Sequence, residues 1–587
     1  MIRIKDHKTR YMFDPFAHLG PKRRRMIEQS WAGLFRKYVL TELPVNLLAK
    51  RFPSGEGHPT KELYAMMGAL LLQQMFDLTD EETVRQFAFN IEWHYALDIT
   101  DNSDESAYVS LKTLWNMREI ITRDGIQDII FDRVTAKFID EFKVCPENQR
   151  LDSMHIRSDM RHLGRIGIFV QCIKKFLVNL RRHHSHLLAQ LDADMVGKYL
   201  DRKQENAFSM VKPSESSRTL EQLASDLFLL VERFRGHDQV SSMTSYHLLV
   251  RVLKEQCLVD DPAHKGRVTV KKNQDVASSS LQNPSDPDAS YDAHKGKGYQ
   301  VQLAETYSTT KESDGKRPLA LITYAEAEPA HHSDAKALKP MLDQVEKQEH
   351  KPDRLLADSI YGSDDNSGYA RKMNTELIAP AMGSLRDGKN SGLDKFTFAA
   401  NGEVLSCPAG HTPYRLHNNT RKGRISACFQ SETCDLCDQR DDCPTQHAKK
   451  GRYLRYRHKD IRLLRRRAFE QTAEFREAYR FRAGIEATNS ELDRRTGVKK
   501  LRIRGLSKVG YCVKLKAAGL NIFRTAACRR RKGGFSPALI PLLALVNVFW
   551  VFKEQISSRV ERFLPKSIFL PAGTGNSGQY TPGTAER

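Results

Sequence analysis

Apolar residues recur at helical spacing through the first 140 residues of the chain. The stretch HPTKELYAMMGALLLQQMFDLTDEETVRQFAFNIEWHYAL carries apolar positions three and four residues apart, which predicts amphipathic helices. Thr79 followed three residues later by Glu82 has the pattern of a capping box, so a helix is expected to begin there. Residues 1–140 are therefore predicted to form a small helical domain.

The pattern changes to short β-capable runs near residue 150 and again after residue 295. A run around Asp152 is followed by a long helical region, roughly 165–265, and by a polar loop, Ala277–Gly298. Strands that alternate with a helical connection predict a mixed α/β sheet built from residues 145–155 and 295–385. From about 458 to 493 the periodicity predicts one long helix. The later β-capable runs are GYQVQLAETYS, PLALITYAEAE, DRLLADSIYG and TELIAPAM.

The charge of the chain favours a polyanionic partner. Of its 587 residues, 93 are Lys or Arg and 72 are Asp or Glu, so the formal net charge is +21. Basic residues cluster, most densely in KKGRYLRYRHKDIRLLRRR (Lys449–Arg467), where Tyr453 and Tyr456 are interleaved. Basic side chains neutralise phosphates and interleaved aromatics can stack on bases, so nucleic acid is the expected partner. A solvated helix surface is the alternative for any single run.

No secretory signal is visible in MIRIKDHKTRYMFDPF, because it lacks an apolar segment. The apolar stretch Phe535–Phe552 approaches the length of a membrane span, yet it contains Pro537, Pro541 and Asn547. We interpret it as part of a C-terminal appendage, residues 526–587, of unassigned role. A cytoplasmic protein without a membrane partner is expected.

Three acidic residues stand out as candidate metal ligands: Asp152, Asp358 and Glu486. Asp is rare within strands, and carboxylates from neighbouring strands and a helix suit Mg²⁺, which prefers oxygen ligands. Tyr479, Arg482 and Glu486 differ by three, four and seven positions, so one helix would carry all three on one face. The alternatives are a turn role for either Asp, a solvated Arg482–Glu486 ion pair, and four rival acids: Asp159, Asp288, Asp292 and Glu305.

The chain resembles the bacterial insertion-sequence transposases that carry a DDE catalytic triad. Within them it resembles the subgroup with a Tyr-x2-Arg-x3-Glu signature, which here is YRFRAGIE, Tyr479 to Glu486. LDSMHIRSD and LLADSIYGS match the contexts of the first and second acids, and the resemblance spans about residues 10–525. It implies an RNase H-like catalytic domain over 145–525, with a helical insertion (about 165–290) and a Cys-rich insertion (about 386–446). It also implies that residues 1–140 form a DNA-binding N-terminal domain.

The resemblance also implies an activity, which is metal-dependent phosphoryl transfer on DNA. Asp152, Asp358 and Glu486 would hold two Mg²⁺ (or Mn²⁺) ions, which assist water in nicking double-stranded DNA at the element ends. The freed 3′-hydroxyl would then attack target DNA, and a homodimer on DNA would coordinate the two ends. The expected DNA-binding residues are Tyr479, Arg482, Arg494, Arg495, Lys499, Lys500, Arg502 and Arg504.

The sequence departs from the family pattern at three places. Asp493 stands where a Lys usually follows the Glu, Met154 where a Thr often follows the first motif's Ser, and Ile360 where a small residue often precedes the Tyr. None of these changes removes a catalytic carboxylate. Two other functions remain open: a DNA-binding protein derived from a transposase that has lost catalysis, and a metal-dependent nuclease that cuts without strand transfer.

Five cysteines crowd into residues 407–443. Cys434 and Cys437 have the spacing of a metal knuckle, and Cys407 and Cys443 would complete a tetrahedral site for a structural Zn²⁺. Reduced, partly buried cysteines without a metal are the alternative. Weaker candidate ligands are Cys428, His411 and His417.

Overall fold

The computed structural model describes residues 2–7, 9, 11–52, 59–201, 208, 210–259, 268–312, 317–382, 392–419, 421 and 423–532. The chain divides into two compact units, 1–528 and 529–587, and the following account concerns the first. The apolar stretch Phe535–Phe552 and nearly all of the expected C-terminal appendage lie outside the described residues.

Most of the described residues between Pro21 and Phe142 lie in helices, as the periodicity predicts. The capping box is confirmed, because the Thr79 side chain accepts from the Glu82 backbone and the Glu82 side chain accepts from the Thr79 backbone. Pro44, Asn90 and Ser110 precede further helices. The elements are α1 (Pro21–Gln29), α2 (Trp31–Tyr38), η1 (Leu40–Glu42), α3 (Val45–Ala49), α4 (Leu63–Met75), α5 (Asp80–Phe89), α6 (Ile91–Leu97), α7 (Asp104–Ala107), α8 (Leu111–Arg123) and α9 (Ile126–Phe142).

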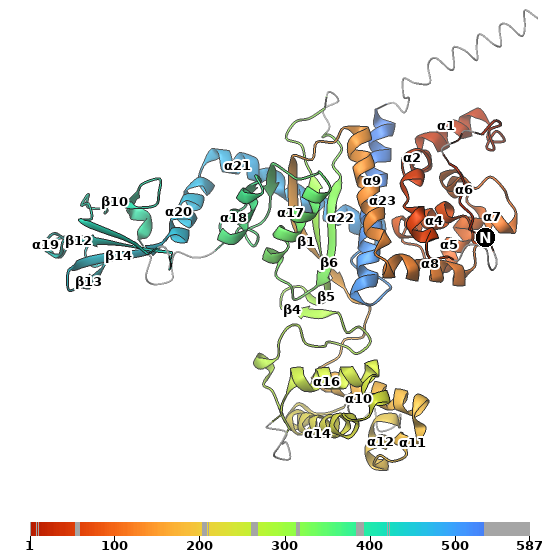
Figure 1. Ribbon diagram of the computed structural model, residues 1–587, viewed down its shortest axis with the longest axis horizontal. Helices are drawn as coiled ribbons and strands as arrows, with labels where there is room; N and C mark the ends of the chain where they lie inside the picture. The colour runs from red at the N-terminus through yellow and green to blue at the C-terminus, as the bar shows by residue number, and fades with distance from the viewer. Residues whose placement is uncertain are drawn as a thin grey trace, which may run out of the picture. The chain divides into compact units, whose positions relative to one another are not determined.

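A six-stranded mixed sheet follows, so the predicted α/β class is confirmed (Figure 1). Its order is β4-β5-β1-β7-β8, with β6 paired to β5. Strand β5 pairs antiparallel with β4, β6 and β1. Strand β7 pairs parallel with β1 and with β8. Each β-capable run of the sequence lies in one of these strands. Their bounds are β1 (Asn148–Arg157), β4 (Ser290–Asp292), β5 (Gly296–Thr306), β6 (Ile322–Pro329), β7 (Arg354–Leu356) and β8 (Glu376–Ile378).

Between β1 and β4 the chain forms helices that share a core of their own, which includes Phe169, Phe176, Leu227 and Leu249. The prediction of a helical region as far as residue 265 was wrong at its end, because Cys257–Val259 pairs with Val268–Val270. Val259 and all three residues of β3 are β-branched, which suits a strand. The elements are α10 (Arg165–His183), α11 (Ser185–Leu188), α12 (Ala193–Leu200), η2 (Pro213–Glu215), α14 (Ser216–Phe234), α15 (Asp238–Ser241), α16 (Thr244–Gln256), β2 (Cys257–Val259), β3 (Val268–Val270) and η3 (Asn273–Asp275).

The helical connection expected between the strands is present after β6, and β8 is followed by small strands in the Cys-rich segment (Figure 1). Strands β11, β12, β14 and β13 form one sheet in that order, and β9 pairs with β10. The elements are η4 (Asp334–Lys336), α17 (Leu338–Lys347), α18 (Asp364–Lys372), η5 (Leu393–Lys395), β9 (Thr397–Phe398), β10 (Val404–Ser406), β11 (Arg415–Asn419), β12 (Arg424–Phe429), α19 (Ser431–Asp435), β13 (Gln446–Ala448) and β14 (Gly451–Arg457).

The single long helix predicted for 458–493 was wrong. The chain instead forms α20 (His458–Glu470), α21 (Ala473–Tyr479), a 3₁₀ turn η7 (Arg480–Ala483) and α22 (Gly484–Thr496). Thr472 caps the start of α21 by accepting from the Phe475 backbone, and this divides α21 from α20. Tyr479, Arg482 and Glu486 therefore belong to three successive elements, and they do not share the face of one regular helix.

Helix α23 (Leu506–Arg531) is largely buried and joins the N-terminal helices to the sheet. One cluster contains residues of α4, one face of β1 and β5, and α23. Packing is close at Gly519, where an added Cβ would lie 2.8 Å from the Cβ of Met75. The last described helix is thus part of the same core as the first ones.

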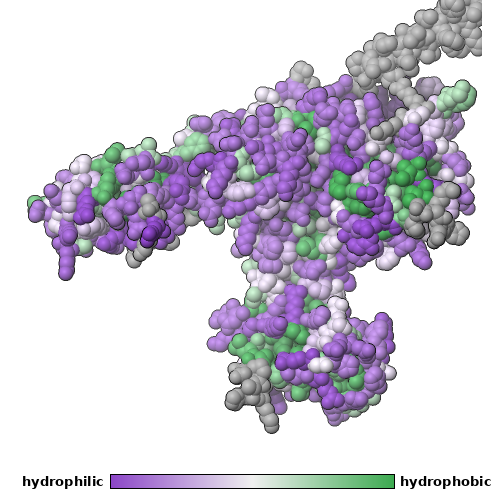
Figure 2. Space-filling view, viewed as in Figure 1, coloured by the Kyte–Doolittle hydropathy of each residue, from purple (hydrophilic) through white to green (hydrophobic). Residues whose placement is uncertain are grey.

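The visible surface is mostly hydrophilic, with small apolar patches (Figure 2). None of the helices in the described part of the chain has the length and apolar content that a membrane crossing needs.

Candidate active site

The parallel pairing of β1 with β7 brings the first two acids together. Asn148 is in register with Arg354 and Arg150 with Leu356, so the same register continued by two residues sets Asp152 beside Asp358. Asp152 lies within β1, beyond its last paired residue with β7, and Asp358 follows the end of β7. Asp152 thus lies inside a strand, whereas Asp358 lies just past the end of one. The carboxylate of Asp358 accepts from the backbone N–H of Ile360 at 2.9 Å.

Helix α22 supplies the third acid, and Arg482 links it to the first. Arg482 donates through Nη1 to Glu486 Oε1 at 2.7 Å and through Nη2 to Asp152 Oδ1 at 3.4 Å. Asn489, one turn after Glu486, donates to Asp152 Oδ2 at 3.3 Å. The side chain of Asp152 is 13% exposed and that of Glu486 63% exposed, so the site opens to solvent on the α22 side.

The electrostatics show that the three carboxylates act on one another. Burial raises the pKa of Asp152 to about 6; the Arg482 charge and a Ser153 backbone hydrogen bond oppose this, and the charges of Asp358 and Glu486 add to it. For Arg482, burial opposes the charged form, yet Asp152, Asp358 and Glu486 together raise its pKa. One guanidinium thus faces three carboxylates, a strongly coupled arrangement of the kind found at functional sites.

Tyr479 borders the same site. Its ring stacks on that of Phe475 with centroids 5.2 Å apart, and burial raises its pKa, with Asp358 and Asp152 adding to the effect and Arg482 opposing it. The structure therefore brings together five of the residues predicted from the sequence: Asp152, Asp358, Tyr479, Arg482 and Glu486.

Beneath the carboxylates lies a buried ionic network that the sequence interpretation missed. Arg150, two residues before Asp152, donates to Glu305 Oε1 at 2.7 Å and to the Phe481 carbonyl at 2.7 Å. The other oxygen of Glu305 accepts from Thr488 at 2.6 Å and from Arg524 at 2.9 Å. Glu305, a rival metal ligand from the sequence, is thus occupied by two arginines and is 1% exposed.

This network joins the strand of the first acid to the helix of the third. Arg150 is on β1, and Phe481 and Thr488 flank Glu486 in sequence. Gly484 begins α22, and a Cβ there would lie 1.9 Å from Arg150 Nη1. A signal was available, because a charged residue inside a β-capable run needs a partner when it is buried. The identity of the partner was not readable from the sequence.

The remaining predicted DNA-binding residues lie in the last turn of α22 or after it, and they have varied surroundings. Arg494 and Lys500 are exposed, whereas Lys499 is half-buried and its backbone N–H donates to Asp493. The other three form ion pairs within the protein: Arg495 pairs with Glu491, Arg502 with Asp77, and Arg504 with Asp159.

The three other rival acids are also engaged elsewhere. Asp288 accepts from the Leu506 backbone, and Asp292 accepts from the His294 and Lys295 backbones. Asp159 pairs with Arg504. The carboxylates of Asp152, Asp358 and Glu486 remain the set best suited to a cation, since hard oxygen donors are what Mg²⁺ binds.

No group of three or more His, Cys, Asp or Glu side chains in the described residues is arranged to hold a metal ion as it stands. At the carboxylate site the donors are of the right chemical type. Burial raises the pKa of Asp152, the charges of Asp358 and Glu486 add to this, and a bound cation would oppose both effects. Arg482 supplies part of the positive charge that a cation would supply, because it forms ion pairs with Asp152 and Glu486.

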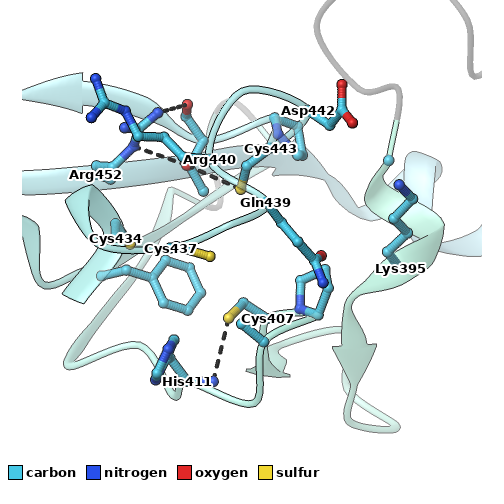
Figure 3. Close-up of a pocket in the computed structure, with 16 residues that line it drawn as sticks. Lys395, Cys407, His411, Cys434, Cys437, Gln439, Arg440, Asp442, Cys443 and Arg452 are labelled. Carbon is cyan, nitrogen blue, oxygen red and sulfur yellow. Dashed lines mark hydrogen bonds between the residues drawn. The ribbon is translucent and has the colours of Figure 1, made fainter.

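The cysteine segment forms a second candidate site. All ten cysteines are free, and Cys407, Cys434, Cys437 and Cys443 line one pocket together with His411 (Figure 3). Burial raises the pKa of Cys434; Arg452 opposes this, and the three other thiols add to it. The His411 backbone N–H donates to Cys407 Sγ at 3.3 Å. The two other weaker candidates do not line this pocket. Cys428 contacts the Tyr414 hydroxyl, and His417 lies on β11.

Comparison with known families gives two matches, both to domains of transposases. Residues 406–526 match the family described as Transposase DDE domain, which covers the cysteine pocket, Glu486 and most of α23. Residues 35–119 match the family described as Transposase domain (DUF772), which covers α3 to most of α8. No curated protein matches the chain. Two separate segments of the chain are thus similar to transposase domains, and these matches support a transposase function.

Proposed function

We propose that the protein is a DNA transposase that binds the ends of a mobile element and catalyses metal-dependent strand cleavage and strand transfer. The observation that carries the proposal is the convergence of Asp152, Asp358 and Glu486 around Arg482, in a chain that matches a transposase DDE domain. The strand order β6-β5-β1-β7-β8, antiparallel then parallel, supports an RNase H-like catalytic fold.

Asp152, Asp358 and Glu486 would hold two Mg²⁺ or Mn²⁺ ions, which supply charge stabilisation for the attacking and leaving oxygens of an in-line displacement. In cleavage, the water oxygen bonds to phosphorus, the bond from phosphorus to the 3′ oxygen breaks, and that oxygen leaves as a hydroxyl. In strand transfer the same hydroxyl attacks a target phosphate, and the target's own 3′ oxygen is released.

The side chains of this chain orient the DNA. Arg482 Nε is buried and has no hydrogen-bond partner, so a donor remains for a phosphate oxygen after its Nη atoms bind carboxylates. Tyr479 lies near the same acids: burial raises its pKa, and the charges of Asp358 and Asp152 add to this. Arg494 and Lys500, both exposed after Glu486, would bind the backbone of flanking DNA. Arg495, Lys499, Arg502 and Arg504 are proposed for the same surface.

A homodimer that brings two element ends together, acting in the cytoplasm at the nucleoid, fits the proposed reaction. We also propose a structural Zn²⁺ held by Cys407, Cys434, Cys437 and Cys443. Four thiols that line one pocket, with no disulfide among them, support it.

The test is a cleavage assay on a supercoiled plasmid that carries the sequences flanking the gene. Wild type and Glu486→Gln are compared with Mg²⁺ or Mn²⁺, and binding to the same DNA is measured in parallel. Nicking at the ends should fall at least about a hundredfold in Glu486→Gln, because several kcal/mol of charge stabilisation are lost, while binding survives. Glu477→Gln is the matched control, because this exposed acid pairs only with Arg480.

The outcomes separate the competing functions. Binding without cleavage by wild type in both metals would identify a DNA-binding protein that has lost catalysis. Cleavage without joined products would identify a nuclease. Equal cleavage by wild type and Glu486→Gln would show that Glu486 is not a catalytic residue.

A further inference from the structure

The four-stranded sheet of the Cys-rich segment has one buried face and one open face. Ile425, Ala427, Leu454 and Tyr456 point into a core that also contains Ile461 of α20, which packs beside the sheet (Figure 1). Side chains alternate between the two faces of a strand, so their neighbours in β12 and β14 must lie on the opposite face. That opposite face is open to solvent.

The strand register identifies the residues of the open face. Arg424 of β12 is directly opposite Arg457 of β14, and Ser426 is opposite Arg455. On the other side of β12, Arg415 of β11 is opposite Cys428. Residues that pair directly across an antiparallel ladder share a face. We call this surface the arginine face and define it by its four exposed arginines: Arg415, Arg424, Arg455 and Arg457.

The charges on this face do not serve the stability of the fold. Like charges directly opposite each other across a ladder are destabilising, yet Arg424 faces Arg457. Strands β11, β12, β13 and β14 contain no acidic residue. None of the four arginines forms an ion pair with an acidic side chain in the described part of the chain; Arg455 donates only to Gln446, at 3.2 Å.

We propose that the arginine face binds the phosphate backbone of double-stranded DNA, at a surface separate from the carboxylate site. The inference rests on the proposed function, because it takes the polyanion to be the DNA on which a transposase acts. Guanidinium groups pair with phosphate through two parallel N–H donors, which suits arginines that have no acidic partner among the described residues. The two outer strands of the face are about 10 Å apart, since neighbouring strands lie about 4.8 Å apart.

The aromatic residues favour a duplex over a single strand. Proteins that hold single strands stack successive bases on exposed aromatic rings. Here the rings gather at one end of the face, where Tyr414 and Tyr453 cover the sulfur of Cys428. The Arg455 guanidinium also lies over the Tyr453 ring, 5.3 Å from its centroid. The rest of the face offers charge without stacking, which fits a backbone whose bases are paired.

The experiment measures how binding to a 30-base-pair duplex of random sequence depends on salt, with the full-length protein. Each phosphate contact contributes about 0.9 to the slope of log K against log salt. The variant R415Q/R424Q/R455Q/R457Q should reduce the magnitude of that slope by about 3 and weaken binding at least about tenfold at 0.1 M salt. The control R182Q/K212Q/R218Q/R233Q removes four exposed positive charges from α10, α14 and the residue before η2, and it should change the slope by less than about 1.

The pair variant R424Q/R457Q tests whether weaker DNA binding is caused by loss of folding. Because it removes a like-charge pair, its melting temperature should equal or exceed that of wild type, while its slope falls by about 1.5 to 2. A single-stranded 30-mer is run beside the duplex and should show a smaller difference between wild type and the arginine variant.

An unchanged slope in the arginine variant overturns the inference, and so does an equal loss in the arginine variant and the control. A loss seen only with the single strand overturns the choice of duplex. Random-sequence binding does not require cleavage, so failure of the proposed function would appear separately, as duplex binding with no metal-dependent nicking by wild type.

Discussion

Arg150 and Glu305 form a buried ion pair, 2.7 Å between Arg150 Nη2 and Glu305 Oε1, directly beneath the candidate active site. Their side chains are 8% and 1% exposed. Through Arg150 the pair reaches the Phe481 carbonyl, and through Glu305 it reaches Thr488, so it fixes α22 against β1. The relative position of Asp152 and Glu486 depends on this contact.

Replacing one member of the pair should be costly. Glu305→Gln leaves Arg150 and Arg524 buried around a neutral side chain, and we expect a loss of about 3–5 kcal/mol in the free energy of unfolding. Urea denaturation followed by fluorescence measures it. Glu346→Gln, an exposed acid that lies 3.9 Å from its Lys351 partner, is the control and should change stability by less than about 0.5 kcal/mol.

The double variant R150M/E305Q separates stability from positioning. Removing both charges should restore part of the lost stability, because the unpaired Arg150 guanidinium is gone and Arg524 keeps its Glu491 partner. Cleavage should stay low, since the bond from Arg150 to the Phe481 carbonyl is gone. Full recovery of cleavage together with stability would show that the pair serves the fold alone.

Gly484→Ala should displace Arg150. The added Cβ would lie 1.9 Å from Arg150 Nη1, so the guanidinium must leave the Phe481 carbonyl or α22 must shift. Cleavage should fall in G484A, and R150M/G484A should be no worse than R150M alone. The control is Gly368→Ala in α18, where nothing lies within 4 Å of the new Cβ and a small gain in stability is expected. Additive losses in the double variant would contradict the mechanism.

Arg482→Gln should make the protein more responsive to divalent cations. Without this guanidinium the repulsion among Asp152, Asp358 and Glu486 is unopposed, so the melting temperature should fall in EDTA and rise more than in wild type on adding Mg²⁺. DNA binding should weaken at the same time. Arg480→Gln, which removes an exposed arginine that pairs with Glu477, should leave the Mg²⁺ response unchanged. An identical Mg²⁺ shift in R482Q and wild type would argue against coordination by these carboxylates.

The raised pKa of Asp152 predicts that its charged form lowers the free energy of unfolding, by an amount that depends on pH. Its folded pKa of about 6 lies above the ordinary 3.8, so folding favours the protonated form and the charged form destabilises the protein above pH 6. Asp152→Asn should therefore stabilise the metal-free protein by about 1–3 kcal/mol at pH 7. The gain should shrink to below about 1 kcal/mol near pH 4, where Asp152 is protonated in the folded state. Denaturation at both pH values checks this, and a gain that grows as the pH falls would refute it.

Zinc content tests the cysteine pocket. Purified protein should carry one Zn²⁺ per chain by elemental analysis, and Cys437→Ser should lose it, because a structural site needs all four ligands. Cys172→Ser, in a buried position among the helices that follow β1, should keep its zinc. Metal-free wild type with four reactive thiols in the pocket would favour plain reduced cysteines.

The sequence predicted those parts of the site that depend on local pattern. Thr79 and Glu82 lie three residues apart, so α5 was readable. Asp152 and Asp358 attracted notice because each interrupts a β-capable run, and the parallel register then brings them together. Glu486 was found from its spacing to Arg482, and their ion pair is present.

The parts that failed depend on contacts between distant segments. The break before α22 involves Arg150, 331 residues from Phe481, so helical periodicity alone could not reveal it. Glu305 seemed a candidate ligand because its arginine partners lie 155 and 219 residues away. The arginine face likewise depends on strand register, since the run Lys449–Arg467 does not reveal that Arg424 lies opposite Arg457.

The order of the three acids along the chain has a consequence for protein synthesis. Arg482 and Asp152 are 330 residues apart, and α23, made last among the described elements, packs against α4 from near the start. A ribosome must therefore translate almost the entire described chain before Glu486 can meet the other two acids. A nascent or prematurely terminated chain can display its N-terminal helices and even its sheet, yet it carries no complete carboxylate set. The proposed cutting of DNA would thereby be withheld until translation is nearly finished.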